Sequence, residues 1–174
     1  MGFKGRPKDG RAWELCTLLG GDAWGWTPSS ASHIMSLDSC VQLLVMVVSQ
    51  GGNLLLNVGP RGDGSLEPAE AQRLKDIGAF LAKYGESIYT TRGGIYDPRW
   101  GGTTCTEKAI YVHVLRVPSD KRVTLPPSTR KVASARYLRD NGKAVFEQSD
   151  AGISLVDIAD MQEEADLVIK LTLE

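Results

Sequence analysis

The 174-residue sequence lacks the features that would assign it to a membrane or nucleic-acid-binding class. Its longest apolar run, residues 43–48, is far shorter than the roughly 18 residues that a membrane-spanning helix needs. Lys and Arg total 20 and Asp and Glu total 21, so the formal net charge is −1 and no basic surface is indicated. A nucleic-acid partner would require such a basic surface to neutralise phosphates. We therefore expect neither a membrane span nor a nucleic-acid partner.

Cysteine and histidine are also scarce. The three cysteines, Cys16, Cys40 and Cys105, are scattered without the spacing of metal ligands, so we expect three free thiols and no metal site. The two histidines, His33 and His113, have no Asp or Cys at ligand spacing and are interpreted as structural. Residues 1–9 contain no apolar stretch typical of a secretory signal, and this leaves the compartment undetermined.

Helical spacing dominates the first half of the chain. Ser36 is a suitable N-cap, and apolar residues then recur at helical intervals as far as residue 48, before Gly51-Gly52. Residues 53–58 are apolar without alternation, which is typical of a strand covered on both faces in a parallel sheet. A second helix is predicted from Pro68 to Tyr84, with Gly85 as its C′ residue and a buried stripe on one face. The members of that stripe are Leu74, Ile77, Leu81 and Tyr84.

A single parallel strand needs neighbours on both sides. Residues 11–19 could supply one further short strand, but two strands cannot close a sheet or cover both faces of residues 54–56. Residues 1–92 are therefore predicted to be part of a larger α/β domain.

The second half has the pattern of an all-β domain. Six short strand-like segments follow residue 89, at residues 110–117, 123–125, 132–138, 144–148, 153–158 and 167–173. Residues 140–142, Asp-Asn-Gly, predict a hairpin with a type I′ turn, and residues 150–152 predict a second turn. Glu163-Glu164 is interpreted as a solvated, charged turn. Residues 93–174 are thus predicted to form an antiparallel β-sandwich, and the fold class is α/β followed by all-β.

Three stretches of the first half carry specific motifs. The first is Trp13-Glu14-Leu15-Cys16-Thr17 followed by Trp24-Gly25-Trp26. The second is residues 48–60, Val-Ser-Gln-Gly-Gly-Asn-Leu-Leu-Leu-Asn-Val-Gly-Pro, and the third is residues 63–89. Together they resemble glycoside hydrolase family 29, the α-L-fucosidases: the first is similar to a paired segment of that family, the second to nearly all of its strand-eight signature, and the third continues the likeness. The competing interpretation is a phosphate-binding loop, but the string lacks the Lys-Ser/Thr pair that such loops use.

The resemblance implies a fold and a set of site residues. It implies that residues 1–92 are the carboxy-terminal part of a (β/α)₈ TIM barrel, about strands seven and eight, followed by the sandwich. Barrel active sites lie at the carboxyl ends of the strands. Glu14 is then expected to end strand seven as a supporting residue or the acid/base. Trp24 would pack on the sugar's apolar C5-methyl face, Trp26 would pack at the rim, and Asn57 would bind substrate or cap strand eight.

The resemblance also implies an activity. Family members are retaining exo-glycosidases that hydrolyse terminal α-L-fucose from glycans, without a cofactor, in compartments that include secreted, periplasmic and lysosomal ones. A retaining enzyme needs a nucleophile, and no Asp here lies in the Trp-rich motif that carries it in the family. The chain is therefore expected to be an inactive fragment by itself. Fucosylated glycans and a missing amino-terminal half of the barrel are its expected partners.

Two alternatives remain open from the sequence. The chain could be one subunit of a split fucosidase that regains activity when the other half is supplied. It could instead act through residues 93–174 as a carbohydrate-binding module, which requires an exposed aromatic platform. The rings available for such a platform are Tyr96, Trp100, Tyr111, Tyr137 and Phe146.

Overall fold

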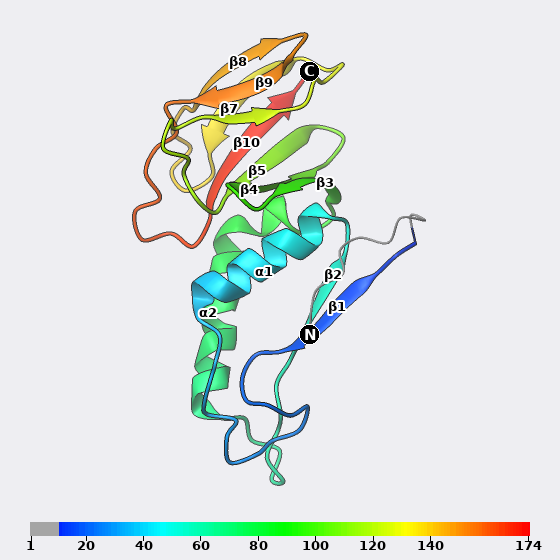
Figure 1. Ribbon diagram of the computed structural model, residues 1–174, viewed down its shortest axis with the longest axis vertical. Coiled ribbons are helices and arrows are strands. Elements are labelled where there is room, and N and C mark those ends of the chain that lie inside the picture. Colours follow the sequence, from blue (N-terminus) through cyan, green and yellow to red (C-terminus); the bar gives the residue numbers. More distant parts are fainter. Residues whose placement is uncertain (1–10) are drawn as a thin grey trace.

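The computed structural model describes residues 11–174 as a helical region joined to a larger β region (Figure 1). The expectation for residues 1–9 lies outside this described part of the chain. Within residues 11–174, neither helix is long and apolar enough to cross a membrane. The architecture is mixed, with two helices, one parallel strand pair and two antiparallel sheets.

The parallel strand pair consists of β1, Glu14–Leu18, and β2, Asn53–Asn57. Glu14 lies opposite Asn53 and Leu18 opposite Asn57, so both strands run in the same direction and in step. The prediction of a parallel strand at residues 53–58 with a partner in residues 11–19 is confirmed. Neither strand has another neighbour within the described residues, and Leu55 of β2 stays 43% exposed.

Helix α1, Leu37–Ser49, begins at the predicted cap. The Ser36 hydroxyl accepts a hydrogen bond from the Ser39 amide at 3.1 Å, which satisfies one amide of the first turn. Val41 and Val45 on one face of α1 are almost fully buried. The helix ends where Gly51 adopts a φ of +75°, a left-handed conformation that costs glycine little.

Helix α2, Pro68–Tyr84, starts with proline in the first turn as predicted. Gly85 does not act as a left-handed C′ residue, because its φ is −59° and the chain continues into the 3₁₀ turn η1, Gly85–Ser87. The Gly85 carbonyl accepts hydrogen bonds from the amides of Ile88 and Tyr89, and these bonds hold the right-handed turn. The buried stripe is narrower than predicted: Tyr84 is buried, but so is Phe80, whereas the other predicted members are half-buried.

The β region contains a five-stranded sheet in the order β3-β4-β5-β10-β7 and a three-stranded sheet in the order β6-β9-β8. The strands are β3 Arg92–Asp97, β4 Gly101–Cys105, β5 Ala109–Val114, β6 Val123–Leu125, β7 Val132–Tyr137, β8 Val145–Ser149, β9 Gly152–Val156 and β10 Leu167–Leu173. All six predicted segments are strands. The sequence pattern missed β3 and β4 because both begin with or contain paired glycines, which have low strand propensity.

The two sheets share one apolar core. Val112 of β5 and Ile169 of β10 face Leu155 of β9, and each of these three side chains is at most 1% exposed. The sheets lie one above the other in Figure 1, with β8 and β9 over β7 and β10. Burying a branched side chain of this kind contributes about 1.5–3 kcal/mol, so this core is the main stabilising feature of the β region.

The prediction of a type I′ hairpin at residues 140–142 is wrong. Asn141 has a φ of +61°, but Gly142 is not left-handed, so the turn is not type I′. The flanking strands β7 and β8 lie in different sheets, and the Arg136–Lys143 bridge beside the turn is isolated and belongs to neither sheet. The chain therefore crosses between the sheets here. The second predicted turn, at residues 150–152, does form, and it joins β8 to β9 with Ser149 opposite Gly152.

A second apolar cluster joins the helices to the five-stranded sheet. Val45 of α1 and Tyr84 of α2 pack with Tyr111 of β5 and Val168 of β10. The end of α1 also approaches β3 closely, since a Cβ on Gly93 would lie only 2.4 Å from the Gly51 nitrogen. The helices and the five-stranded sheet are thus in direct contact across an apolar interface.

Glu164 was predicted to lie in a solvated, charged turn, and for this residue the prediction is wrong. Its side chain is 16% exposed and accepts hydrogen bonds from Tyr84, from Lys83 at 3.0 Å and from Arg139 at 3.4 Å. Burial alone would raise the pKa of this carboxyl, but the hydrogen bonds from Tyr84 and Lys83 lower it below its usual value. The loop between β9 and β10 is therefore attached to the end of α2.

Candidate functional site

The candidate site lies at the carboxyl ends of β1 and β2. The Asn57 side-chain amide donates a hydrogen bond to the Trp24 carbonyl at 2.9 Å. The Asn57 carbonyl accepts one from the Leu19 amide, also at 2.9 Å. These contacts bring the loop after β1 against the end of β2, so Trp24, Trp26 and Asn57 lie in one neighbourhood, at the strand ends where binding residues are usual in parallel sheets.

The two tryptophans of this loop differ in their contacts. The Trp26 indole donates a long hydrogen bond of 3.5 Å to Glu67, and the Arg61 guanidinium lies 5.8 Å from its ring centroid. Arg61 and Glu67 also form an ion pair at 2.6 Å. Trp24 is 53% exposed, and its ring makes no hydrogen bond or ring contact with the described residues. Trp24 is therefore the ring with a free face.

Hydrogen bonds within the loop hold its shape. The Asp22 carboxylate accepts from Ser29 at 2.7 Å and from Thr27 at 3.4 Å, and the Thr27 amide donates to Ser30 at 2.9 Å. At the far end of the loop, the His33 ring hydrogen-bonds to the neighbouring Ser32 hydroxyl at 3.1 Å. The hydrogen bonds that the Asp22 carboxylate accepts thus come from residues of its own loop.

The structure separates Glu14 from the other three site residues. Glu14 begins β1 instead of ending it, and it lies opposite Asn53, four residues before the level of Asn57. At about 3.3 Å per residue, Glu14 is about 13 Å along the strand from the end where Trp24 lies. The expectation that Glu14 ends its strand is wrong, because pairing starts directly after Trp13, whose carbonyl accepts the Asn53 amide.

Comparison with known sequences and structures identifies the relatives of this chain. The sequence model described as Alpha-L-fucosidase matches residues 4–86. The tissue α-L-fucosidase of Macaca fascicularis is 32% identical over 148 residues, which are 80% of this chain and 31% of that protein. The chain belongs to the α-L-fucosidase family.

Solved structures of family members resemble the whole described fold. The α-L-fucosidase isoenzyme 1 from Paenibacillus thiaminolyticus superposes with a TM-score of 0.83 at 27% identity, over 98% of this chain and 43% of that one. The Thermotoga maritima α-fucosidase in complex with fucose has a TM-score of 0.76 at 26% identity, over 97% and 41% of the two chains. The α-L-fucosidase of Branchiostoma floridae is 34% identical, over 65% of this chain and 26% of that protein. The chain spans less than half the length of each of these relatives, and the Macaca and Branchiostoma proteins align with it through their carboxy-terminal part.

One buried ionisable residue near the loop after β1, Glu70, was missed from the sequence. Glu70 in the first turn of α2 is only 1% exposed, and its Oε2 atom is buried with no hydrogen-bond partner among residues 11–174. Burial raises the pKa of this carboxyl, and the charge of Glu67 raises it further. The sequence carries no signal for this, because an acidic residue in a first helical turn is usually solvated and favoured by the helix dipole.

Replacing Glu70 by glutamine is expected to stabilise the protein at pH 7 by on the order of 1 kcal/mol. The pKa of Glu70 is raised in the folded state, so above the unfolded pKa near 4.5 the folded protein keeps a proton that the unfolded chain has lost. The free energy of unfolding therefore falls as the pH rises through the folded pKa. Below pH about 4.5 the carboxyl is protonated in both states, so the gain should vanish. Urea unfolding at pH 4 and pH 7 measures this. Glu107→Gln, at an exposed position, is the control, and an equal gain at both pH values would contradict the prediction.

The thiols and the metal-ligand residues show no assembled site among residues 11–174. Cys16 is exposed, Cys40 is buried and Cys105 is half-buried, and none forms a disulfide. Burial raises the pKa of the Cys40 thiol, and the positive charge of Arg73 opposes this. In that part of the chain, no three His, Cys, Asp or Glu side chains gather as they would around a metal ion.

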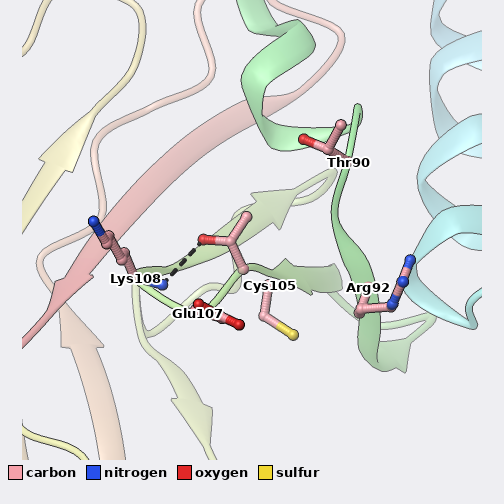
Figure 2. A pocket seen from close by; sticks show the side chains of 6 residues that line it. Thr90, Arg92, Cys105, Glu107 and Lys108 are labelled. Atoms are coloured by element: carbon pink, nitrogen blue, oxygen red, sulfur yellow. Dashed lines mark hydrogen bonds between the residues drawn. The ribbon is translucent and has the colours of Figure 1, made fainter.

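A shallow hollow of about 670 Å³ lies beside β3 and the end of β4 (Figure 2). Its lining residues are Thr90, Arg92, Cys105, Thr106, Glu107 and Lys108. No aromatic ring contributes to it, and three of the five rings in residues 93–174, Trp100, Tyr111 and Tyr137, are buried. The described β region therefore offers no flat aromatic platform of the kind on which sugars stack.

Proposed function

We propose that this chain contributes strands seven and eight of the (β/α)₈ barrel of a retaining α-L-fucosidase, followed by its β-sandwich domain. Residues 1–92 would be the barrel part and residues 93–174 the sandwich. The observation that carries the proposal is the parallel pair of β1 and β2, whose carboxyl ends bear Asn57 and the Trp24 loop. The free outer edges of that pair within the described residues agree with a barrel wall that needs further strands.

The proposed substrate is a terminal α-L-fucose unit of a glycan. The exposed indole of Trp24 offers a flat apolar face, which suits the C5-methyl side of fucose. Asn57 holds the backbone of that loop, and Trp26 forms the rim together with Arg61 and Glu67. The fucose complex of the Thermotoga maritima relative supports this class of ligand.

The catalytic carboxylates are proposed to lie outside the described part of this chain. A retaining glycosidase uses two carboxyl groups about 5–5.5 Å apart. Near Trp24, Asp22 accepts hydrogen bonds from its own loop and Glu67 is paired with Arg61. Glu14 begins its strand at the opposite end, which argues against Glu14 as the acid/base. The polypeptide alone is accordingly proposed to be inactive.

The test is release of nitrophenol from 4-nitrophenyl α-L-fucoside. The chain alone should give no release above the blank, whereas mixing with the remaining barrel segment of the Paenibacillus thiaminolyticus relative should restore turnover. In the mixture, Trp24→Ala should lower kcat/KM about tenfold, a loss of about 1.4 kcal/mol in transition-state binding, chiefly through a higher KM. Turnover by the chain alone, or none in the mixture, would contradict the proposal.

The alternative of a split enzyme rests on the same free strand edges and would be supported by the same reconstitution. The alternative of a stand-alone carbohydrate-binding module is disfavoured. Its ring platform would have to come from Tyr96 and Phe146, which are half-buried, because the other three rings of residues 93–174 are buried.

A further inference from the structure

The backbone after β2 approaches the tryptophan loop more closely than a side chain would permit. A Cβ on Gly59 would lie 2.5 Å from both the Gly25 carbonyl carbon and the Trp26 nitrogen, and 2.9 Å from the Gly25 oxygen. All three are backbone atoms, so no side chain can rotate away to make room. The φ of Gly59 is not left-handed, which means that space and not backbone conformation requires glycine here.

Asn57 contacts the same loop on the other side of Gly25. Its side-chain amide donates to the Trp24 carbonyl at 2.9 Å, while Gly59 packs against the peptide between Gly25 and Trp26. Two residues of β2 and its extension therefore hold three consecutive residues of the loop. We propose that Asn57 and Gly59 are positioning residues, a clamp that sets the orientation of the Trp24 indole toward the sugar. This inference rests on the proposed fucose-binding role of Trp24.

The contacts of Trp26 explain why the clamp acts on Trp24. The Trp26 indole already donates a hydrogen bond to Glu67, and the Arg61 guanidinium lies over its ring, so these contacts anchor the loop at Trp26. The Trp24 ring has no such contact in the described structure, and only its backbone is held, through Asn57 and Gly59. A backbone fixed before binding reduces the ordering cost that a sugar ligand would otherwise have to offset.

Two nearby glycines provide matched controls. A Cβ on Gly25 or on Gly62 would meet no heavy atom within 4 Å, and neither residue has a left-handed φ. Gly25→Ala and Gly62→Ala should therefore leave the loop in place, whereas Gly59→Ala must displace it. The three substitutions add the same methyl group, so only the local space distinguishes them.

The first measurement is the ¹⁵N spectrum of the tryptophan indoles in the full chain, assigned through Trp24→Phe and Trp26→Phe. Gly59→Ala is expected to shift or broaden both loop indole signals and to leave that of Trp100, which is 6% exposed, unchanged. Both control variants should retain all the wild-type positions. Loop signals that stay at their wild-type positions in Gly59→Ala would overturn the inference.

Asn57→Asp is the second variant, and it decides the outcome if Gly59→Ala fails to fold and loses the Trp100 signal. The aspartate keeps the shape of the side chain but replaces the N–H donor with a second oxygen, which repels the Trp24 carbonyl. The Trp24 indole should then shift without a change in the Trp100 signal. An unchanged Trp24 signal would overturn the role of Asn57.

A titration with L-fucose separates failure of the clamp from failure of the proposed function. In the wild-type chain, fucose should shift the Trp24 indole, and the dissociation constant should rise at least tenfold in Gly59→Ala but not in Gly62→Ala. Equal affinity in wild type and Gly59→Ala would overturn the clamp and leave the proposed function standing. Absence of any fucose response in wild type would count against the proposed function. The indole signals of Gly59→Ala and Asn57→Asp, recorded without fucose, would still test the clamp.

Discussion

Replacing Asp166 by alanine is expected to lower the free energy of unfolding by about 3–5 kcal/mol, because it leaves a buried histidine without its partner. Asp166 precedes β10, and its Oδ2 atom lies 2.6 Å from Nδ1 of His113 on β5. Both side chains are 0% exposed, so the imidazole is shielded from bulk solvent and depends on the carboxylate for its hydrogen bond at Nδ1. Urea unfolding followed by circular dichroism measures the loss.

The hydrogen bonds around His113 explain the size of this effect. The Thr104 hydroxyl donates its hydrogen to the Ser87 carbonyl, so it can only accept from Nε2 of His113, 3.2 Å away. The imidazole therefore carries a proton on Nε2, and a second proton lies between Nδ1 and Asp166. The pair joins β4, β5 and the start of β10 to the turn after α2, so its loss should loosen all four.

Asp166→Asn is the matched control. Its side-chain amide can donate to a neutral Nδ1 while Nε2 remains the donor to Thr104, so the geometry survives without the charge. The loss for asparagine should be less than half that for alanine. A stability for Asp166→Ala within about 1 kcal/mol of wild type would contradict the prediction, since that is the range of ordinary substitutions.

Leu155→Ala should cost about 2–5 kcal/mol, the usual range for truncating a fully buried leucine. Leu155 lies in β9, the middle strand of the three-stranded sheet, and is 1% exposed in the core shared with Val112 and Ile169. Val145→Ala on the neighbouring β8 is the control, because Val145 is 55% exposed and should change stability by less than about 0.5 kcal/mol.

The Leu155→Ala variant also tests whether the two proposed domains, residues 1–92 and 93–174, unfold separately. Val45 and Tyr84 of the helices pack with Tyr111 and Val168 of the sheet, so we expect one cooperative transition. In Leu155→Ala, the helical circular dichroism and the fluorescence of buried Trp100 should then share one midpoint. A helical signal that keeps its wild-type midpoint while Trp100 unfolds earlier would show that the helices unfold independently of the β region.

The sequence by itself determined the local elements and the family. The apolar spacing after Ser36, the proline at residue 68 and the unbroken apolar run of β2 are signals carried by neighbouring residues. Such signals suffice for helices, for a parallel-type strand and for the six alternating segments of the β region. The string from Gly51 to Pro60 was long enough to indicate the α-L-fucosidases, and the comparisons confirm that assignment.

Only the tertiary structure decided which distant residues meet. The start of β1 at Glu14 depends on its pairing with β2, and no local pattern marks where pairing begins. The glycine-rich strands β3 and β4 exist because the sheet and the end of α1 pack against them, which overrides their weak strand propensity. The crossing between sheets at Asn141 and the attachment of Glu164 to α2 likewise depend on partners elsewhere in the chain.

The buried polar groups also depend on the tertiary structure. His113 and Asp166 are 53 residues apart in sequence, and Glu70 reads as an ordinary acidic residue in a first helical turn. Periodicity reports which face of an element is apolar, but it does not report which polar groups from separate elements share a buried site. In the candidate site, the exposed indole of Trp24 and the close approach of Gly59 to the Gly25–Trp26 peptide are likewise products of packing, because they join two loops that are more than 30 residues apart.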